Sequence, residues 1–264
     1  MKSPKHLAIA SMAIASLNSA PLIAGEAITS ALGANYSFSN VSINYLDWTS
    51  GTEERSGKAD FAYLELEGGA GWDWGEFYFF TDIENPGRGW DNAPPDNSRF
   101  VIKPIADVKL GNSNWYFHVQ DYLLNEDDFY VNNLVTGIAY KFSGENGSFL
   151  RPFFGPHFQN STFYDGFNGY MAGWVGAYNF SVKGQNLTLS QWHEFEFDRA
   201  EEHYKTDDDI RIGDGESHGM NGAVALWWNI NKQITTGIQY RYADNKLGSQ
   251  SYQTGPIYTV KYNF

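Results

Sequence analysis

The feature that most constrains this sequence is a series of segments in which apolar and polar residues alternate. Alternation with a period of two is typical of a β-strand whose two faces meet different surroundings. Clusters of turn-forming residues separate the segments. We predict twelve strands, at 33–48, 60–72, 75–83, 98–110, 114–124, 131–142, 148–158, 168–181, 185–197, 218–230, 233–243 and 254–264.

The connections between these strands alternate in length. Short turns are expected at 72–75, 111–114, 143–148, 183–185 and 229–232. Longer polar stretches are expected at 50–59, 84–97, 125–130, 159–167, 198–217 and 244–253. Up-and-down membrane barrels have this asymmetry, with short periplasmic turns and long outer loops. We therefore predict an all-β fold, a transmembrane antiparallel up-and-down β-barrel of about 12 strands. A soluble multi-strand β-protein is the alternative, but it would need no such alternation.

The closing segment indicates which face meets lipid. Tyr258, Val260 and Phe264 point to one side, whereas Thr259 and Lys261 point to the other. Apolar residues outside and charged residues inside invert the arrangement of a soluble barrel. The chain ends on an aromatic residue, a feature that the insertion machinery reads in outer-membrane barrels. We predict that Phe264 is such an assembly signal.

The N-terminal residues have the order of a secretory signal. Lys2 and Lys5 precede an apolar run at 7–17, and small residues follow. The run is too short to span a membrane as a mature helix. We therefore predict a cleaved signal peptide at 1–25 and an outer-membrane β-barrel at 26–264.

The composition excludes several classes of function. The 264 residues carry a net charge of −13 and no cysteine. The negative charge argues against nucleic-acid binding, which requires a basic surface. The absence of cysteine excludes a disulfide scaffold and thiolate chemistry.

One strand suggests what lines the lumen. Phe61, Tyr63, Glu65 and Glu67 share a face that the alternation turns inward. Aromatic rings can stack on a flat ring and carboxylates can accept hydrogen bonds from hydroxyl groups. The further predicted lumen residues are Tyr78, Arg99, Lys103, Tyr116, Gln120, Tyr122 and Arg241. The structural alternative is that these charges only pair with one another.

Several of these residues belong to a run that resembles a known family. The run YLELEGGAGWDWGEFYFFTD at Tyr63–Asp82, the WYF at 115–117 and the closing YNF are similar to the Tsx/OmpK family of nucleoside-specific outer-membrane channels. The resemblance implies that Glu65 and Glu67, at the matching YLE-x-E positions, help to form the nucleoside path, together with Tyr63.

The resemblance also implies partners and location. Its members are monomeric twelve-stranded barrels of the Gram-negative outer membrane that pass nucleosides, and some serve as phage receptors. We therefore expect a passive nucleoside channel, not an enzyme, with no cofactor and no metal. The expected partners are nucleosides, outer-membrane lipid and lipopolysaccharide, the insertion machinery and bacteriophage.

Four alternative functions are weighed against this one. A lipid-modifying enzyme could use Ser217 with His218, or His193 with Glu194, but adjacent strand residues point to opposite faces. The acidic residues of loop 198–217 could bind Ca²⁺, but they lack the spacing of a calcium loop. A general porin and a purely adhesive barrel are the other two.

Overall fold

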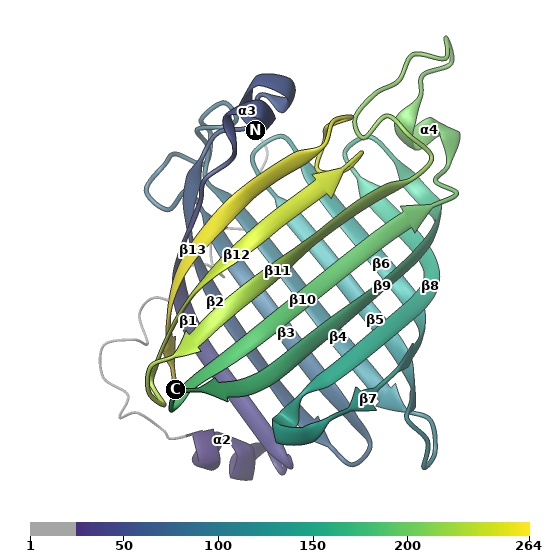
Figure 1. The fold of residues 1–264 in the computed structure, drawn as a ribbon. Helices are drawn as coiled ribbons and strands as arrows, with labels where there is room; N and C mark the ends of the chain where they lie inside the picture. The colour runs from purple at the N-terminus through teal and green to yellow at the C-terminus, as the bar shows by residue number, and fades with distance from the viewer. Residues whose placement is uncertain (1–24) are drawn as a thin grey trace, which may run out of the picture.

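Thirteen strands in residues 25–264, the part of the chain that the computed structural model describes, form one antiparallel sheet that closes into a barrel (Figure 1). The strands are β1 Tyr36–Leu46, β2 Phe61–Trp72, β3 Gly75–Glu84, β4 Arg99–Lys109, β5 Trp115–Asn125, β6 Tyr130–Tyr140, β7 Phe142–Ser143, β8 Phe149–Ser161, β9 Asp165–Val182, β10 Gln185–Phe197, β11 Gly219–Asn229, β12 Ile234–Asp244 and β13 Gln253–Asn263.

Two pairings close the barrel. The first strand pairs with the last, β1 with β13, and β6 pairs with β8 past the two-residue strand β7. The other long strands each pair with their neighbours in sequence. The structure therefore confirms the predicted up-and-down barrel, with twelve long strands and β7 as a short addition at the foot of β8.

The outer face of the barrel is apolar and its inner face is polar, as predicted. On β1, the outward Ile43 is 66% exposed and the adjacent inward Asn44 is 1% exposed. On β13, Val260 and Tyr258 lie outside, whereas Thr259 is buried inside. Apolar side chains thus cover the outside, as expected for a barrel in lipid.

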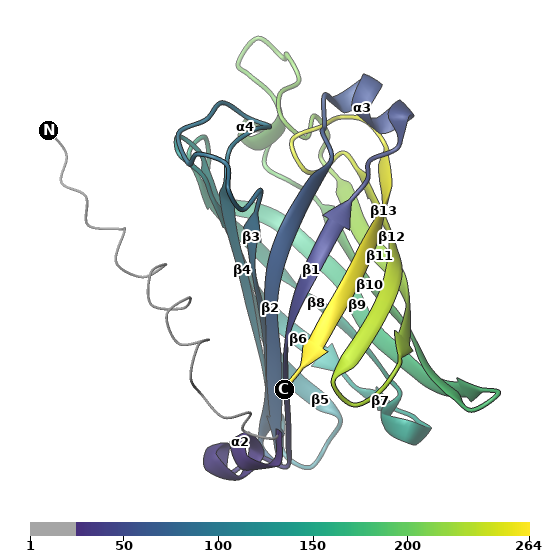
Figure 2. The same ribbon diagram turned by 90° about the vertical axis from the view of Figure 1, so that its left-hand side faces the viewer.

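The two ends of the barrel differ (Figure 2). The longer loops and the helices α3 (Ser50–Ser56) and α4 (Glu201–Tyr204) lie at one end. Helix α2 (Gly25–Leu32), the 3-10 turn η1 (Glu145–Gly147) and the C-terminus lie at the other. No helix among the described residues is long and apolar enough to cross a membrane. The predicted signal segment, 1–25, lies outside the described residues except for Gly25.

Aromatic rings gather towards both ends of the outer surface. At the short-turn end, Trp72 stacks on Trp74 at 5.0 Å, and Trp115 meets Tyr140 edge-on at 4.9 Å. Near the opposite end, the rings of Phe154, Tyr170 and Phe197 lie within 6.2 Å of one another. Such paired girdles mark the two membrane interfaces of a β-barrel.

One predicted loop is wrong. We expected a long outer loop at 159–167, but β8 and β9 continue through most of this range and are joined only by 162–164. The hydroxyl of Ser161 accepts hydrogen bonds from the backbone N–H groups of Phe163 and Tyr164, at 3.3 and 3.0 Å, and forms a tight hairpin. Two of the polar residues that suggest a loop, Gln159 and Ser161, are buried inward strand residues, because a lumen face is itself polar.

Two predicted boundaries also shift. The segment expected as one strand at 131–142 ends at Tyr140, and β7 follows as a separate short strand. The first predicted strand, 33–48, is shorter and begins at Tyr36 because α2 precedes it. The indole N–H of Trp72 donates to the carbonyl of Leu32 at 3.1 Å and holds α2 near the barrel end.

The β6–β8 seam depends on two glycines. A Cβ atom on Gly155 would lie 2.0 Å from the carbonyl oxygen of Thr136, and one on Gly137 would lie 2.0 Å from the carbonyl oxygen of Phe154. Because both contacts are with backbone, a side chain here would push the two strands apart.

We predict that Gly155→Ala destabilises the folded barrel by about 1–3 kcal/mol, the usual range for overpacking. The measurement is urea unfolding of the refolded protein in lipid vesicles, followed by tryptophan fluorescence. Gly144→Ala is the control, because its nearest neighbour would be the Cβ of Ser148 at 3.4 Å. Equal stability of the two variants would contradict the role of the seam.

Candidate functional site

The structure places all eleven predicted lumen residues on the inner face of the barrel. Phe61, Tyr63, Glu65 and Glu67 come from β2, Tyr78 from β3, Arg99 and Lys103 from β4, Tyr116, Gln120 and Tyr122 from β5, and Arg241 from β12. They do not form one cluster. The contacts divide ten of them into three groups, and Tyr116 belongs to a separate network nearer the short turns.

The first group surrounds the two glutamates of β2. Glu67 accepts hydrogen bonds from Asn40 at 2.9 Å, from Tyr78 at 2.9 Å and from the ammonium of Lys261 at 2.8 Å. Glu65 has weaker partners, Ser42 at 3.3 Å and Lys261 at 4.0 Å, and also a side-chain hydrogen bond with Asp82. Both oxygens of Glu67 are thus occupied by the protein, whereas Glu65 retains acceptor capacity for a solute.

The second group lies at the end of β2 and β4 nearer the long loops. The guanidinium of Arg99 pairs with Glu84 at 2.6 Å and lies 5.1 Å from the ring centre of Phe61. The Phe61 ring lies 5.9 Å from that of Tyr63. Paired charge beside two rings gives this part of the wall an aromatic surface with little net charge.

The third group meets in the middle of the lumen. Lys103 and Gln120 both contact the carboxylate of Glu194 on β10. Arg241 lies 4.6 Å from the ring centre of Trp192, also on β10, and Lys103 lies 5.8 Å from the same ring. Tyr122 and Tyr63 interact electrostatically with the Arg241 guanidinium.

Arg241 differs from the other arginines of the inner wall. Arg99 pairs with Glu84, and Arg151 pairs with Glu76 at 2.7 Å. Arg241 has no hydrogen bond or ion pair within the described residues, and its stacking on Trp192 is the contact that holds it. Its N–H groups are therefore available to acceptors on a solute.

The inner wall below this level is a closed network. Asp107 bridges His118 at 2.8 Å and Arg151 at 2.9 Å, and Arg151 shares Glu76 with Lys141. These charged groups pair with one another, as expected if they serve only to neutralise each other inside the barrel. Tyr116 is buried and interacts electrostatically with Glu76, Arg151 and Asp107.

The sequence reading missed Trp192 and Trp227 as lumen residues. Trp192 supports Lys103 and Arg241, and the ring of Trp227 lies 4.4 Å from Lys261. Both occupy inward positions of strands that were correctly predicted. Alternation is the signal that could have found them: Trp192 is two residues from the inward Glu194 on β10, and Trp227 lies between the outward Leu226 and Trp228 on β11.

A family model described as "Nucleoside-specific channel-forming protein, Tsx" matches residues 43–264. The chain belongs to this family. The match confirms the resemblance carried by the Tyr63–Asp82 run, and it covers every strand of the barrel except the first half of β1.

Solved structures with a similar course of the chain are distant in sequence. The NanC porin is 11% identical to this Tsx-family chain, with a TM-score of 0.49, and the match covers 85% of this chain and 98% of that one. An outer membrane channel from Pseudomonas putida F1 is 12% identical, with a TM-score of 0.45, and the match covers 86% of this chain and 94% of that one.

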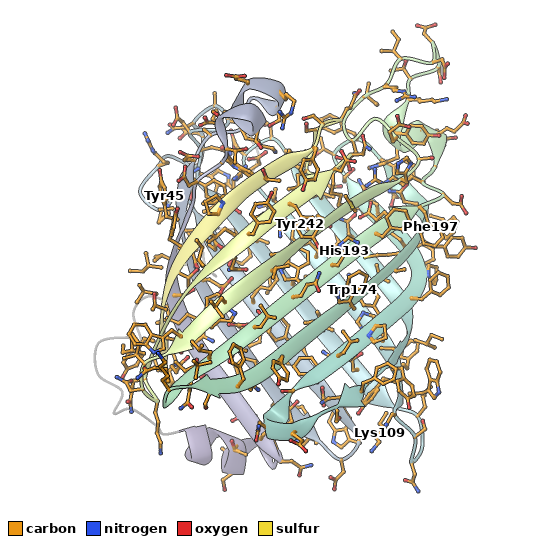
Figure 3. All side chains as sticks on the ribbon, in the orientation of Figure 1. Tyr45, Lys109, Trp174, His193, Phe197 and Tyr242 are labelled. Carbon is orange, nitrogen blue, oxygen red and sulfur yellow. The ribbon has the colours of Figure 1, made fainter. Side chains whose placement is uncertain are left out.

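The residue pairs considered for catalysis do not converge in this Tsx-family barrel. His193 points outward between the rings of Trp174, at 4.6 Å, and Tyr242, at 5.8 Å (Figure 3), whereas Glu194 points inward. His218 lies against the ring of Phe195, at 6.5 Å. Among residues 25–264, no group of three or more His, Asp or Glu side chains is placed to hold a metal ion.

The longest loop is fastened to its neighbour at the barrel mouth. Arg199, whose side chain is fully buried, pairs with Glu196 at 2.7 Å and donates to the carbonyls of Asn245 at 2.9 Å and His218 at 3.2 Å. Lys246 contacts the same glutamate. Arg199 therefore joins loop 198–218 to the loop after β12.

Asp214 completes this clamp. Its carboxylate accepts the backbone N–H of Gly248 at 2.8 Å and lies 3.6 Å from Arg199. Burial by itself would raise the pKa of Asp214, but the neighbouring His203, Lys246 and Arg199 outweigh it and hold the pKa below its usual value. The stabilisation from Asp214 is therefore present at neutral pH and is lost as the pH falls through this lowered pKa.

We predict that Arg199→Met releases loop 198–218, because it removes the donor to the Asn245 and His218 carbonyls and leaves the buried Glu196 with Lys246 as its remaining ion-pair partner. The measurement is the rate of proteinase K cleavage in this loop, which should rise about tenfold or more if the clamp loses 1.4 kcal/mol or more. Arg211→Met is the matched control, since the Arg211–Glu216 pair is largely exposed. Equal cleavage of both variants would refute the clamp.

Proposed function

We propose that this chain is a nucleoside-selective channel of the Gram-negative outer membrane that works by facilitated diffusion. The family match supports a channel, and the description of that family supports nucleosides as the solute. The observation that carries the proposal is a lumen in which aromatic rings stand beside hydrogen-bonding groups that the protein leaves partly unoccupied.

The chemistry of a nucleoside suits this lumen. Its base is a flat ring that can stack on Phe61, Tyr63 or Trp192. Its sugar hydroxyls can donate to Glu65, and oxygen or nitrogen acceptors on the base can receive the N–H groups of Arg241. A neutral solute also loses little hydration energy when it enters a lumen whose charges are mostly paired.

Passive transport follows from weak binding at several positions. Binding must be favourable enough to draw a solute in and weak enough to let it leave. The partly exposed residues of β2, β3, β12 and β13 offer such positions along the wall. No step in this proposal changes a covalent bond, so the protein acts as a channel and not as an enzyme.

The remaining roles also belong to the proposal. Residues 1–25 serve as the export signal, and Phe264 serves as the recognition residue for the insertion machinery. Phe264 is partly exposed beside Tyr262, at 5.5 Å, and its backbone N–H donates to Ser39. The barrel acts as a monomer among lipid and lipopolysaccharide, and its long outer loops are the surface that a phage would contact.

The first test is single-channel current through the refolded protein in a planar bilayer, with and without adenosine or thymidine. We expect a small conductance that each nucleoside blocks in a concentration-dependent way. A steady conductance that ignores nucleosides would make the protein a general porin. An absence of conductance by folded protein would favour the adhesive barrel.

A second prediction concerns the glutamates of β2. Glu65→Gln together with Glu67→Gln should weaken nucleoside block about tenfold, because a hydrogen bond to a charged acceptor contributes about 1.5–3 kcal/mol. Most of the loss should come from Glu65→Gln alone, because Glu67 is already occupied by Asn40, Tyr78 and Lys261.

The control for the single variant Glu65→Gln is Glu145→Gln in η1, outside the lumen, which also removes one negative charge. Folding of each variant is checked by its heat-dependent shift in gel mobility. Unchanged block in a folded double variant would remove both glutamates from the nucleoside path.

A further inference from the structure

The Lys103–Glu194 ion pair crosses the lumen from wall to wall, as does the Arg151–Glu76 pair between β8 and β3 nearer the short turns. Lys103 lies on β4 and Glu194 on β10, and the two strands are separated in the sheet by β5, β6, β8 and β9. The ammonium nevertheless contacts Oε1 of Glu194, and each side chain is 11% exposed. Side chains can meet in this way only where the interior of the barrel is narrow.

Further contacts hold this crossing pair in place. Gln120 on β5 donates to the same Oε1 at 2.9 Å, and its amide nitrogen lies 3.2 Å from the sulfur of Met171 on β9. The ring of Trp192 lies beneath the Lys103 ammonium at 5.8 Å. A buried charge with an opposite charge, an amide donor and a ring around it has little freedom to swing aside.

The two sides of the crossing pair differ in how they are filled. On the β5, β6, β8 and β9 side, the inner wall is mainly occupied by buried side chains: His118, Gln120, Val135, Arg151, His157 and Met171. On the opposite side the inward residues Glu65, Tyr78, Arg241 and Lys261 remain partly exposed, whereas most of the inward residues of β1 and β13 are buried. The open part of the lumen is therefore off-centre.

We propose that the Lys103–Glu194 pair is the constriction that sets the width of the pore. It confines solutes to a path between Trp192 and the partly exposed inward residues of β2 and β3. The inference rests on the channel function and does not require that the solute be a nucleoside.

The chemistry of the pair also predicts what it selects. Two opposite charges in contact present a strong local dipole and no net charge, so neither small cations nor small anions gain a net electrostatic advantage. Solutes that carry both hydrogen-bond donors and acceptors can exchange contacts with Gln120, Glu194 and Arg241 as they pass. The constriction thus favours neutral polar solutes over ions of either sign.

The test is the conductance in potassium chloride, without nucleoside, of the double variant Lys103→Met with Glu194→Gln. Loss of the pair should widen the path and raise the conductance at least about twofold, since ion flow through a narrow pore depends steeply on its width. The reversed pair, Lys103→Glu with Glu194→Lys, should return the conductance towards that of the natural protein.

The matched control is Lys205→Met with Asp209→Asn, which removes an exposed ion pair of loop 198–218 and changes the same charges. Its conductance should not change. An unchanged conductance in the folded lumen variant, or a reversed pair that behaves like the missing pair, would overturn the proposal.

If the double variant does not fold, a second measurement tests the same proposal. The chain has no cysteine, so Lys103→Cys offers a single thiol for a bulky methanethiosulfonate reagent. Modification at this position should lower the conductance of the folded barrel sharply, whereas modification of Lys205→Cys should not. Equal conductance before and after modification at position 103 would place the constriction elsewhere.

A failure of nucleoside block would leave these results unaffected, because no nucleoside is present in any of them. Conversely, nucleoside block with an unchanged conductance in the double variant would uphold the proposed function and refute the crossing pair as the constriction. The two proposals can therefore fail separately.

Discussion

The rest of the structure depends on the closure of the sheet. A backbone group without a hydrogen-bond partner in hydrocarbon costs several kcal/mol, so a sheet in lipid can have no free edge. The β1–β13 pairing covers the free edges of those two strands, and the β6–β8 pairing covers those of β6 and β8. The second seam is the more demanding, because Gly155 and Gly137 lie where backbone atoms of the facing strand leave no room for a side chain.

Closure of the sheet also brings charged side chains together inside the lumen. Every second residue of each strand points inward, so charged side chains from distant parts of the sequence face one another across a narrow space. Most of them pair, as Glu76 does with Arg151 and Lys141. Glu65 and Arg241 are left with spare capacity, and these are the groups that we propose a passing solute binds.

The same geometry gives the two sides of the lumen different roles: one side is filled by paired side chains, and the other is open to solutes. The network around Asp107 and His118 fills one side of the barrel and is satisfied internally. The crossing pair stands between this filled side and the open wall. In our proposal a few side chains set the width and polarity of the path, whereas the barrel itself needs only alternation and closure.

Much of this architecture could be read from the sequence, because a strand in a membrane barrel repeats a simple pattern. Alternation alone identified twelve strands and placed Tyr63, Glu65 and Arg241 inside. Polar composition misled only where inward strand residues resemble a loop, as near Ser161. Tertiary structure alone decided which inward residues meet, for example Lys103 with Glu194 and Arg241 with Trp192. The reason is physical: side-chain direction follows from local backbone geometry, but contacts across the lumen depend on strand tilt, register and closure, which involve the whole chain at once.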